Sequence, residues 1–241
     1  MWISQSELGE TSAMRQPFGG VVFDLDDVLY PGRQYTLGGC RAVADYLFTT
    51  YGVRLYEAMV ARSETGDGLS AMEQTVRECF TGQIDAALMR CRHVFWTHAP
   101  RLTLFPDAAL ALAYLRARRV RLAVVSRNQP HVHAANAAAL RLDVLLDCVL
   151  CAGSPDYADS IAGSLMLAEL ALDVPLTRMV YVGATEQSDF RAAIQTGMVT
   201  AQVNRTESAI VSALAPDPSP HILLPTLAAL PGALLDYAAQ R

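Results

Sequence analysis

The sequence predicts an α/β fold: a doubly wound, Rossmann-like parallel sheet of about five strands with an inserted all-helical cap domain. Three observations support this prediction. Short apolar segments alternate with stretches of helical periodicity, one connection is far longer than a crossover helix requires, and 241 residues that are 52% hydrophobic can bury a large core. Such alternation of strands and helices indicates parallel strands joined by right-handed crossovers.

Five segments are predicted to be buried strands because they are apolar, rich in β-branched residues and bounded by Gly, Asn, Ser or Asp. They are GGVVFDL (19–25), VRLAVVS (120–126), DCVLCAG (147–153), MVYVGA (179–184) and MVTAQVN (198–204). Stretches of helical period follow three of them. These are PHVHAANAAALRL (130–142), DSIAGSLMLAELAL (159–172) and QSDFRAAIQTG (187–197). The later segment ILLPTLAALPGALL (222–235) contains two prolines and is predicted to be a terminal helix or loop against the core.

The connection between the first and second predicted strands is helix-like and contains no strand-like run. A crossover helix needs far fewer residues, so we expect an inserted helical domain. Residues 32–104 are assigned to this cap, and residues 15–31 together with 105–241 to the α/β core. The segment PDAALALAYLRARR (106–119) is the expected crossover helix into the second strand. Residues 1–14 are expected to be a disordered tail.

Composition favours a small soluble ligand. The net charge of −5 and the absence of a block rich in basic residues leave no electrostatic footprint for nucleic acid or an anionic membrane. All 19 basic residues are Arg, so chemistry that requires a Lys amine is excluded. The five cysteines lack the spacing of a zinc site or a disulfide framework, which favours reduced thiols. No signal-peptide-like segment is present, and a cytoplasmic location is expected.

Candidate catalytic residues cluster where the first predicted strand ends. The segment VVFDLDDVLYPG places Asp24, Asp26 and Asp27 directly after the apolar run. Open α/β sheets bind ligands at the carboxyl ends of their strands, and alternation puts Asp24 and Asp26 on the same side. Two adjacent carboxylates repel each other unless a cation lies between them or one is protonated, which indicates a metal or an acid/base pair. A capped turn between strand and loop is the structural alternative.

Three segments resemble motifs of the haloacid dehalogenase superfamily, in its phosphatase-like branch with a helical cap. VVFDLDDVLY is similar to the first motif, an apolar strand followed by D-x-D-x-[TV]-L. The strand that ends in Ser126 resembles the second motif, and MVYVGATEQSDF resembles the fourth. The resemblance extends over most of the chain outside the cap. It implies Mg²⁺-dependent hydrolysis of a small phosphorylated metabolite, with the cap selecting the substrate.

The resemblance also implies roles for individual residues. Asp24 would be the nucleophile that forms an aspartyl-phosphate, and Asp26 the acid and base that protonates the leaving group and then activates water. Ser126 would hydrogen-bond a phosphate oxygen. Mg²⁺ would be bound by the Asp24 carboxylate, the Asp26 backbone carbonyl, Asp189 and water, which are the oxygen ligands that a hard cation prefers.

Two positions depart from the family pattern. Ala184 stands where the fourth motif has Asp, and it offers no side-chain oxygen to a metal. The Lys of the third motif is missing, and Asp159 lies closest to its position by spacing. Glu186 is a candidate replacement for the metal ligand, and Arg127 for the positive charge at the phosphate. Strand alternation alone would aim Arg127 away from Ser126.

These losses predict a weakened or inactive site, because deleting one preorganised electrostatic group typically costs about 10²- to 10³-fold in rate. Two functions are left open. One is a slow phosphohydrolase, and the other is a pseudoenzyme that binds a ligand or phosphate, or regulates. A dehalogenase is disfavoured because the first motif of that branch lacks the second Asp, and a phosphonate-cleaving enzyme because it needs a Lys in the cap.

Side chains near the start of the cap have two interpretations. Tyr30, Arg33, Tyr35 and Arg41 lie at or just after the end of the first motif, where they either touch a substrate or belong to a linker. The aromatic residues in HVFWTH (93–98) are expected to be core side chains.

Overall fold

The computed structural model describes residues 17–64, 67–80, 84–152, 161–184, 187–205 and 219–240. Its centre is a parallel sheet of six strands, which confirms the predicted α/β fold class and adds one strand. The strands are β1 (Gly20–Asp24), β2 (Arg121–Ser126), β3 (Cys148–Cys151), β4 (Met179–Gly183), β5 (Val199–Val203) and β6 (Ile222–Leu224). Within the described ranges, every helix is too short or too polar to cross a membrane.

The strands lie in the order β3-β2-β1-β4-β5-β6. The chain starts at the centre of the sheet, moves outward through β2 and β3, and then returns to the other side of β1 to add the remaining strands. This reversal creates a topological switch point between β1 and β4. Open α/β sheets bind ligands at such a point, outside the carboxyl ends of the strands.

Residues 222–235 were expected to form a helix or loop. Residues 230–235 are helical, but residues 222–224 form the sixth strand. Ile222 to Leu224 pair with β5, and Pro225 follows directly. Ile222 and Leu224 are buried whereas Leu223 is 73% exposed, as in a strand at the edge of a sheet. Three residues are too few to carry a periodic signal, so the pairing with β5 decides this element.

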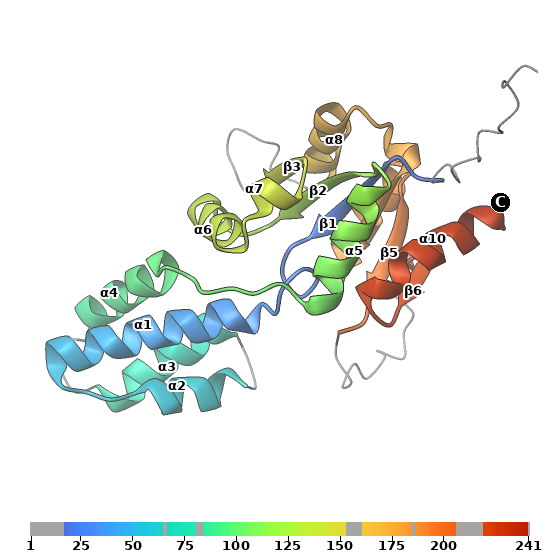
Figure 1. Ribbon diagram of the computed structural model, residues 1–241. Helices are drawn as coiled ribbons and strands as arrows, with labels where there is room; N and C mark the ends of the chain where they lie inside the picture. The colour runs from blue at the N-terminus through green and yellow to red at the C-terminus, as the bar shows by residue number, and fades with distance from the viewer. Residues whose placement is uncertain are drawn as a thin grey trace, which may run out of the picture.

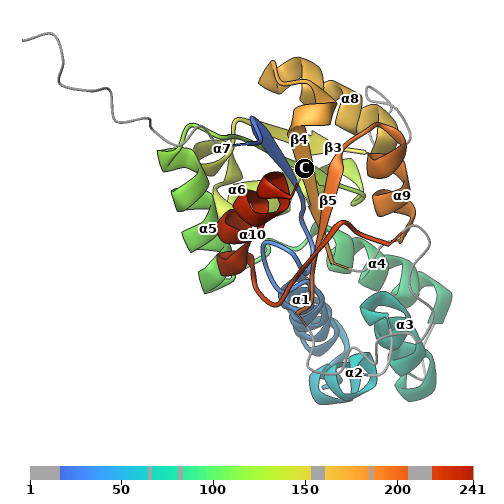
Figure 2. The same cartoon turned by 90° about the vertical axis from the view of Figure 1, so that its right-hand side faces the viewer.

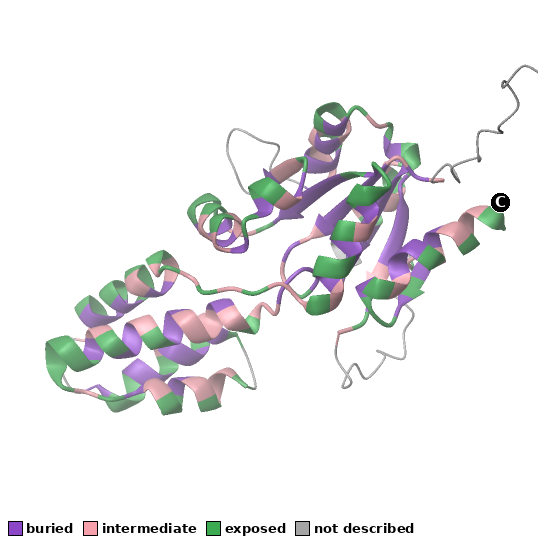
Figure 3. Cartoon of the chain, in the orientation of Figure 1, coloured by how far each residue is buried: buried purple, intermediate pink, exposed green. Residues whose placement is uncertain are grey.

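Helices cover both faces of the sheet. They are α5 (Pro106–Ala117), α6 (Pro130–Leu140), α7 (Leu142–Leu145), α8 (Ile161–Leu172), α9 (Gln187–Gln195) and α10 (Leu230–Ala239), with the 3₁₀ turns η1 (Leu176–Arg178) and η2 (Leu227–Ala229). Figure 2 shows α5 and α10 on one side of the sheet, and α8 and α9 on the other. Val21 and Phe23 of β1 belong to the first apolar layer and Val22 to the second, as strand alternation requires. Figure 3 shows the strands buried between these helices.

Four further helices form a separate bundle between β1 and α5. They are α1 (Arg33–Tyr51), α2 (Tyr56–Ser63), α3 (Gly68–Cys79) and α4 (Ile84–Thr97). Helix α1 packs on α2 and α4, and α3 packs on the same two helices. Figure 1 shows this bundle, which we call the cap, joined to the core by two connecting segments. The segments run side by side, because Phe105 N–H donates to the Leu29 carbonyl at 2.9 Å.

A half-buried ion pair ties the loop after β1 to the C-terminal part of the core. One guanidinium nitrogen of Arg205 lies 2.7 Å from both carboxylate oxygens of Asp107, at the start of α5, and the other donates to the Val28 carbonyl at 2.7 Å. Asp107 also accepts from Leu227 N–H at 2.7 Å, and the guanidinium lies over the Phe105 ring. Segments distant in sequence therefore meet at one charged pair.

Candidate functional site

The ends of β1 and β2 bring together two of the predicted site residues. Asp24 is the last residue of β1 and pairs in register with Val125, one residue before the end of β2 at Ser126. Asp24 is half-buried, and its carboxylate accepts from Leu25 N–H at 2.7 Å. Ser126 is 1% exposed, and its hydroxyl accepts from Asn128 N–H at 3.1 Å. The carboxyl ends of β1 and β2, where these two residues lie, are on the side of the sheet where the cap is attached (Figure 1).

The loop after β1 is tightly folded, and this fixes the direction of Asp26. Asp27 has a left-handed φ of 56°, its N–H donates to the Tyr30 carbonyl at 2.9 Å, and its carboxylate accepts from Gly32 N–H at 2.9 Å. Asp27 is exposed and stabilises the turn itself. Both of these Asp27 hydrogen bonds lie within the turn, so Asp27 has a structural role there.

Both oxygens of the Asp26 carboxylate accept hydrogen bonds from neutral donors. The Tyr30 hydroxyl donates to Oδ1, and Asn128 Nδ2 donates to Oδ2 at 2.7 Å. Asn136 Nδ2, on α6, donates in turn to the Tyr30 hydroxyl oxygen at 3.1 Å. A network of three side chains thus holds Asp26 in place.

Burial raises the pKa of Asp26 above its ordinary value of 3.8, with a smaller contribution from the nearby Asp27 charge, although the two hydrogen bonds oppose this shift. The pKa of Tyr30 is also raised, first by burial and then by the Asp26 charge, so its hydroxyl stays protonated and donates. The environment therefore favours a protonated Asp26 more than water does, which suits a group that delivers a proton.

Arg127 and Asp189 are brought together, although different roles were expected for them. The Arg127 guanidinium forms an ion pair with Asp189 Oδ1, and the Tyr181 hydroxyl donates to Oδ2 at 3.2 Å. The Asp189 side chain is 1% exposed, whereas the Arg127 side chain is 50% exposed. The acidic residue expected at the metal is therefore in contact with the cation expected at the phosphate.

The described residues do not fit a magnesium site. Ala184 is buried and has no polar side-chain atom, and its backbone carbonyl accepts from Gln202 Nε2 at 2.7 Å. Across the described ranges, no three His, Cys, Asp or Glu side chains are grouped so that they could hold a metal ion. Glu186 and Asp159 lie outside the described residues, so the roles expected for them stay predictions.

A cavity of about 180 Å³ lies between Asp26 and the cap. The core lines it with Asp26, Tyr30, Asn128 and Asn136. The cap lines it with Tyr35 and Thr36 from α1, Asp67 and Leu69 at the start of α3, and Phe95 and Trp96 from α4. The cap therefore places side chains directly opposite the acidic group of the core.

Sequence reasoning missed several of these residues. Asn128 had a usable signal, because it follows Ser126 by two positions at the end of a strand. Asn136 and Asp67 had none, since they come from a core helix and a cap helix whose positions depend on packing. Phe95 and Trp96 were expected only in the core. Phe95 is buried as expected, and both also line the cavity.

The four candidates near the start of the cap separate into two pairs. Tyr30 and Tyr35 line the cavity. Arg33 forms an exposed ion pair with Glu64 at 3.2 Å, and the Arg41 guanidinium lies 3.5 Å from the centre of a tyrosine ring of α2. The aromatic members of this set therefore lie at the cavity, while the charged members contact other parts of the cap.

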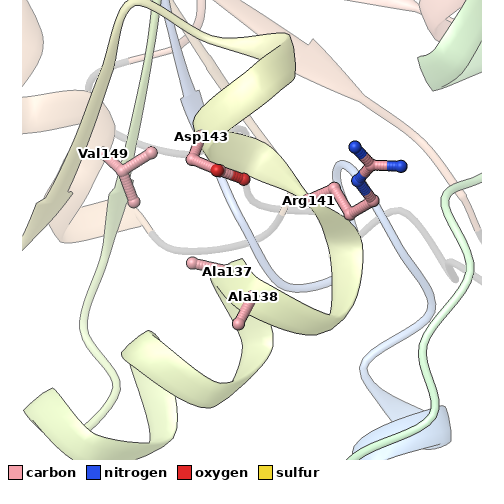
Figure 4. Close-up of a pocket in the computed structure, with 5 residues that line it drawn as sticks. All are labelled: Ala137, Ala138, Arg141, Asp143 and Val149. Atoms are coloured by element: carbon pink, nitrogen blue, oxygen red, sulfur yellow. The ribbon is translucent and has the colours of Figure 1, made fainter.

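A second cavity, of about 420 Å³, lies away from the strand ends. Figure 4 shows its lining side chains, which come from the end of α6, from α7 and the turn before it, and from β3. They are Ala137, Ala138, Arg141, Asp143 and Val149. This cavity contains none of the predicted site residues, so the candidate site is the smaller cavity with the adjoining ends of β1 and β2.

A family model described as haloacid dehalogenase-like hydrolase matches residues 18–197 of the chain. The search of curated protein sequences found no match to this chain. Solved structures match over nearly their full length. A putative β-phosphoglucomutase from Thermotoga maritima is 17% identical, with a TM-score of 0.63 and coverage of 90% of this chain and 98% of that one.

Two further solved structures give similar values. A 2-haloacid dehalogenase from Pseudomonas syringae pv. Tomato DC3000 is 21% identical, covers 91% of this chain and 99% of its own, and has a TM-score of 0.59. A haloacid dehalogenase-like hydrolase from Xanthomonas campestris is 16% identical and has a TM-score of 0.58. The match covers 93% of this chain and 98% of that one. At these identities the likeness concerns the fold alone.

Proposed function

The chain belongs to the haloacid dehalogenase-like hydrolases, and from this premise we propose that it binds a small phosphorylated metabolite at the ends of β1 and β2 and has lost most metal-dependent hydrolysis. The ligand would place its phosphate near Asp24 and Ser126, and its alcohol portion beside Asp26. The observation that carries the proposal is the ion pair between Asp189 and Arg127. In this pair the Asp189 carboxylate, which the family pattern assigns to the metal, contacts the Arg127 guanidinium instead.

The binding half of the proposal rests on the polar groups at the strand ends. The Ser126 hydroxyl accepts one hydrogen bond from Asn128 N–H, and its own proton is available to a phosphate oxygen. Asp26 lies where burial raises its pKa, so a proton on this group reduces the repulsion of an incoming phosphate. Arg127, the residue after Ser126, is half exposed, and its charge is paired with Asp189.

The loss of hydrolysis rests on electrostatics. Attack of one anion on another requires positive charge at the transferring phosphoryl group. Ala184 supplies no side-chain oxygen for a metal, and the sequence contains no Lys that could provide positive charge instead. If removal of each group costs about 10²- to 10³-fold in rate, as in comparable sites, turnover falls far below that of an intact enzyme.

A slow phosphohydrolase is the second candidate, and the environment of Asp26 favours it. In this reaction an Asp24 oxygen attacks phosphorus, the bond to the leaving alcohol breaks, and the Asp26 proton passes to the leaving oxygen. Water then attacks phosphorus, the bond to Asp24 breaks, and Asp26 takes up a proton from that water. Burial raises the pKa of Asp26 and so favours its role as proton donor in the first step, and Tyr30 and Asn128 fix the orientation of its carboxyl group.

The test is to measure binding and turnover on the same protein preparations. Inorganic phosphate binding would be followed by calorimetry, and turnover on sugar phosphates and para-nitrophenyl phosphate with Mg²⁺. The proteins are wild type, Asp24→Asn, Ala184→Asp and, as a matched control, Asp143→Asn on the surface of α7. We expect phosphate to bind to wild type and to the control, with turnover close to background.

Ala184→Asp should raise turnover if the missing ligand limits the reaction. Wild-type turnover that is fast and disappears in Asp24→Asn would overturn the loss of hydrolysis and favour the enzyme. Absence of phosphate binding in all variants would overturn the binding half. 2-Chloropropionate belongs in the panel because several structural neighbours are dehalogenases, and release of chloride would replace both candidates.

A further inference from the structure

The cavity next to Asp26 has a chemical character that the family fold does not specify. We propose that it accepts a small organic group carrying an ammonium, so that the full ligand is a phosphomonoester of a small amino alcohol. The phosphate part of this inference rests on the proposed function. The ammonium part rests on the cavity itself.

The cavity is rich in hydrogen-bond acceptors, and the described residues that line it include no basic side chain. Asp67 contributes a carboxylate near the solvent side, where Oδ2 also accepts from Ser70 N–H at 2.8 Å. Asn136 is fully buried, and its Oδ1 has no hydrogen-bond partner in the structure. Its Nδ2 donates to the Tyr30 hydroxyl at 3.1 Å, so this amide is part of the polar wall on the Asp26 side of the cavity.

Aromatic rings surround the rest of the cavity. The rings of Tyr35, Phe95 and Trp96 form a cluster with centroids 5.5 to 6.4 Å apart, and Tyr30 lies opposite them on the core side. Ring faces attract cations, and aromatic residues beside an acidic group are a recurrent way to recognise ammonium groups. An anionic group in the same place would lie near the Asp67 carboxylate, with no basic side chain among the described lining residues.

The volume limits the size of the group. At about 30 Å³ for each water-sized unit, 180 Å³ holds about six non-hydrogen atoms. This suits a two- or three-carbon amino alcohol. The position of the cavity also fits the proposed binding mode. In that mode the leaving oxygen of the phosphomonoester is beside Asp26, and Asp26 lines the cavity, so the alcohol portion would enter it.

The experiment compares four probes on the full chain by calorimetry and ligand-observed NMR. They are phosphoethanolamine, glycerol 3-phosphate, inorganic phosphate and ethanolamine without phosphate. Phosphoethanolamine and glycerol 3-phosphate are similar in size, so their ratio of affinities reports the ammonium. We expect phosphoethanolamine to bind about 5- to 30-fold more tightly, which is the range of a desolvated cation–π contact.

Two variants and one control locate the effect. Asp67→Asn removes the charge and keeps a side chain that can cap α3, so it should reduce the preference by about 2- to 5-fold. Trp96→Leu should remove most of the remaining preference. Asp85→Asn, an exposed acidic residue on α4 that does not line the cavity, should leave the preference unchanged.

The two proposals fail in different ways. Ethanolamine binding that depends on Asp67 and Trp96 would support the cavity assignment even if phosphate does not bind, in which case the proposed function falls. Phosphate binding with equal affinity for phosphoethanolamine and glycerol 3-phosphate would overturn the cavity assignment and leave the proposed function standing. A preference that survives unchanged in both variants would also overturn it, because the ammonium would then lie elsewhere.

Discussion

At the scale of single residues, Asp26 combines burial with a complete set of hydrogen bonds. Its two oxygens accept from Tyr30 and Asn128, and Asn136 orients the tyrosine hydroxyl. Hydrogen bonds to a carboxylate usually lower its pKa, but burial outweighs them here and the pKa is raised. The site therefore holds an acidic group ready to carry a proton, beside a second carboxylate, Asp24, at the end of β1.

This raised pKa has a defined effect on stability. In the unfolded chain Asp26 loses its proton near pH 3.8, whereas in the folded chain it keeps the proton to a higher pH. Between these two values the folded state binds more protons, so the free energy of unfolding falls as pH rises, by at most about 1.4 kcal/mol per pH unit. We expect Asp26→Asn to remove this decline, measured by urea unfolding over about pH 4 to 8.

Asp143→Asn provides the control for this measurement, because Asp143 is exposed on α7. It should follow the pH dependence of wild type. If wild type and Asp26→Asn show parallel pH profiles, burial does not raise the pKa of Asp26 in solution. The role of proton donor would then lose its main support.

At the scale of elements, the helix ends of the cap are set by local backbone chemistry. Helix α1 ends at Gly52, which has a left-handed φ of 71° and whose N–H bonds to the carbonyls of Leu47 and Phe48. Residues with a side chain are disfavoured in this conformation by about 1 kcal/mol. A Cβ at Gly52 would meet no atom within 4 Å, so backbone strain is the main cost there.

We expect Gly52→Ala to lower the free energy of unfolding by about 1 kcal/mol. Gly232 provides a matched comparison, because it lies inside α10 and a Cβ there also meets no atom within 4 Å. Gly232→Ala should raise the free energy of unfolding by about 0.5 to 1 kcal/mol, since Ala is the better helix former. Thermal and urea unfolding of both variants measure the difference, and equal effects of the two substitutions would contradict the left-handed cap.

At the scale of the whole molecule, the pair of Arg205 and Asp107 joins parts of the chain that the sheet alone does not connect. It links the loop after β1, through the Val28 carbonyl, to the start of α5 and to the turn at Leu227. The side chains of Arg205 and Asp107 are only 13% and 17% exposed. Removing one member of a buried pair leaves a charge without its partner, which is costly.

Arg205→Met should therefore lower the free energy of unfolding by about 2 to 4 kcal/mol. Arg62 offers the control, because its ion pair with Glu78 lies at the surface, and Arg62→Met should cost less than about 1 kcal/mol. Chemical unfolding of the two variants measures both. Similar small losses in the two would mean that the Arg205 pair contributes no more than a surface contact.

The sequence by itself determined the architecture, and it predicted the position of the candidate site. Five of the six strands are apolar runs with clear boundaries, and Asp24, Asp26 and Ser126 follow from their place at strand ends, because parallel strands present their carboxyl ends at one edge. The sixth strand was missed, since three residues beside a proline carry no periodic signal and depend on pairing with β5.

Only the tertiary structure decided which side chains meet. The contact of Arg127 with Asp189, the hydrogen bond from Asn136 to Tyr30 and the approach of Asp67 to the cavity each join elements far apart in sequence. Local propensity specifies a helix and its buried face, but the partner across the interface depends on how helices pack and how the cap sits over the sheet. For this reason the motif predicted a phosphate site, whereas the fold revealed the composition of the cavity beside it.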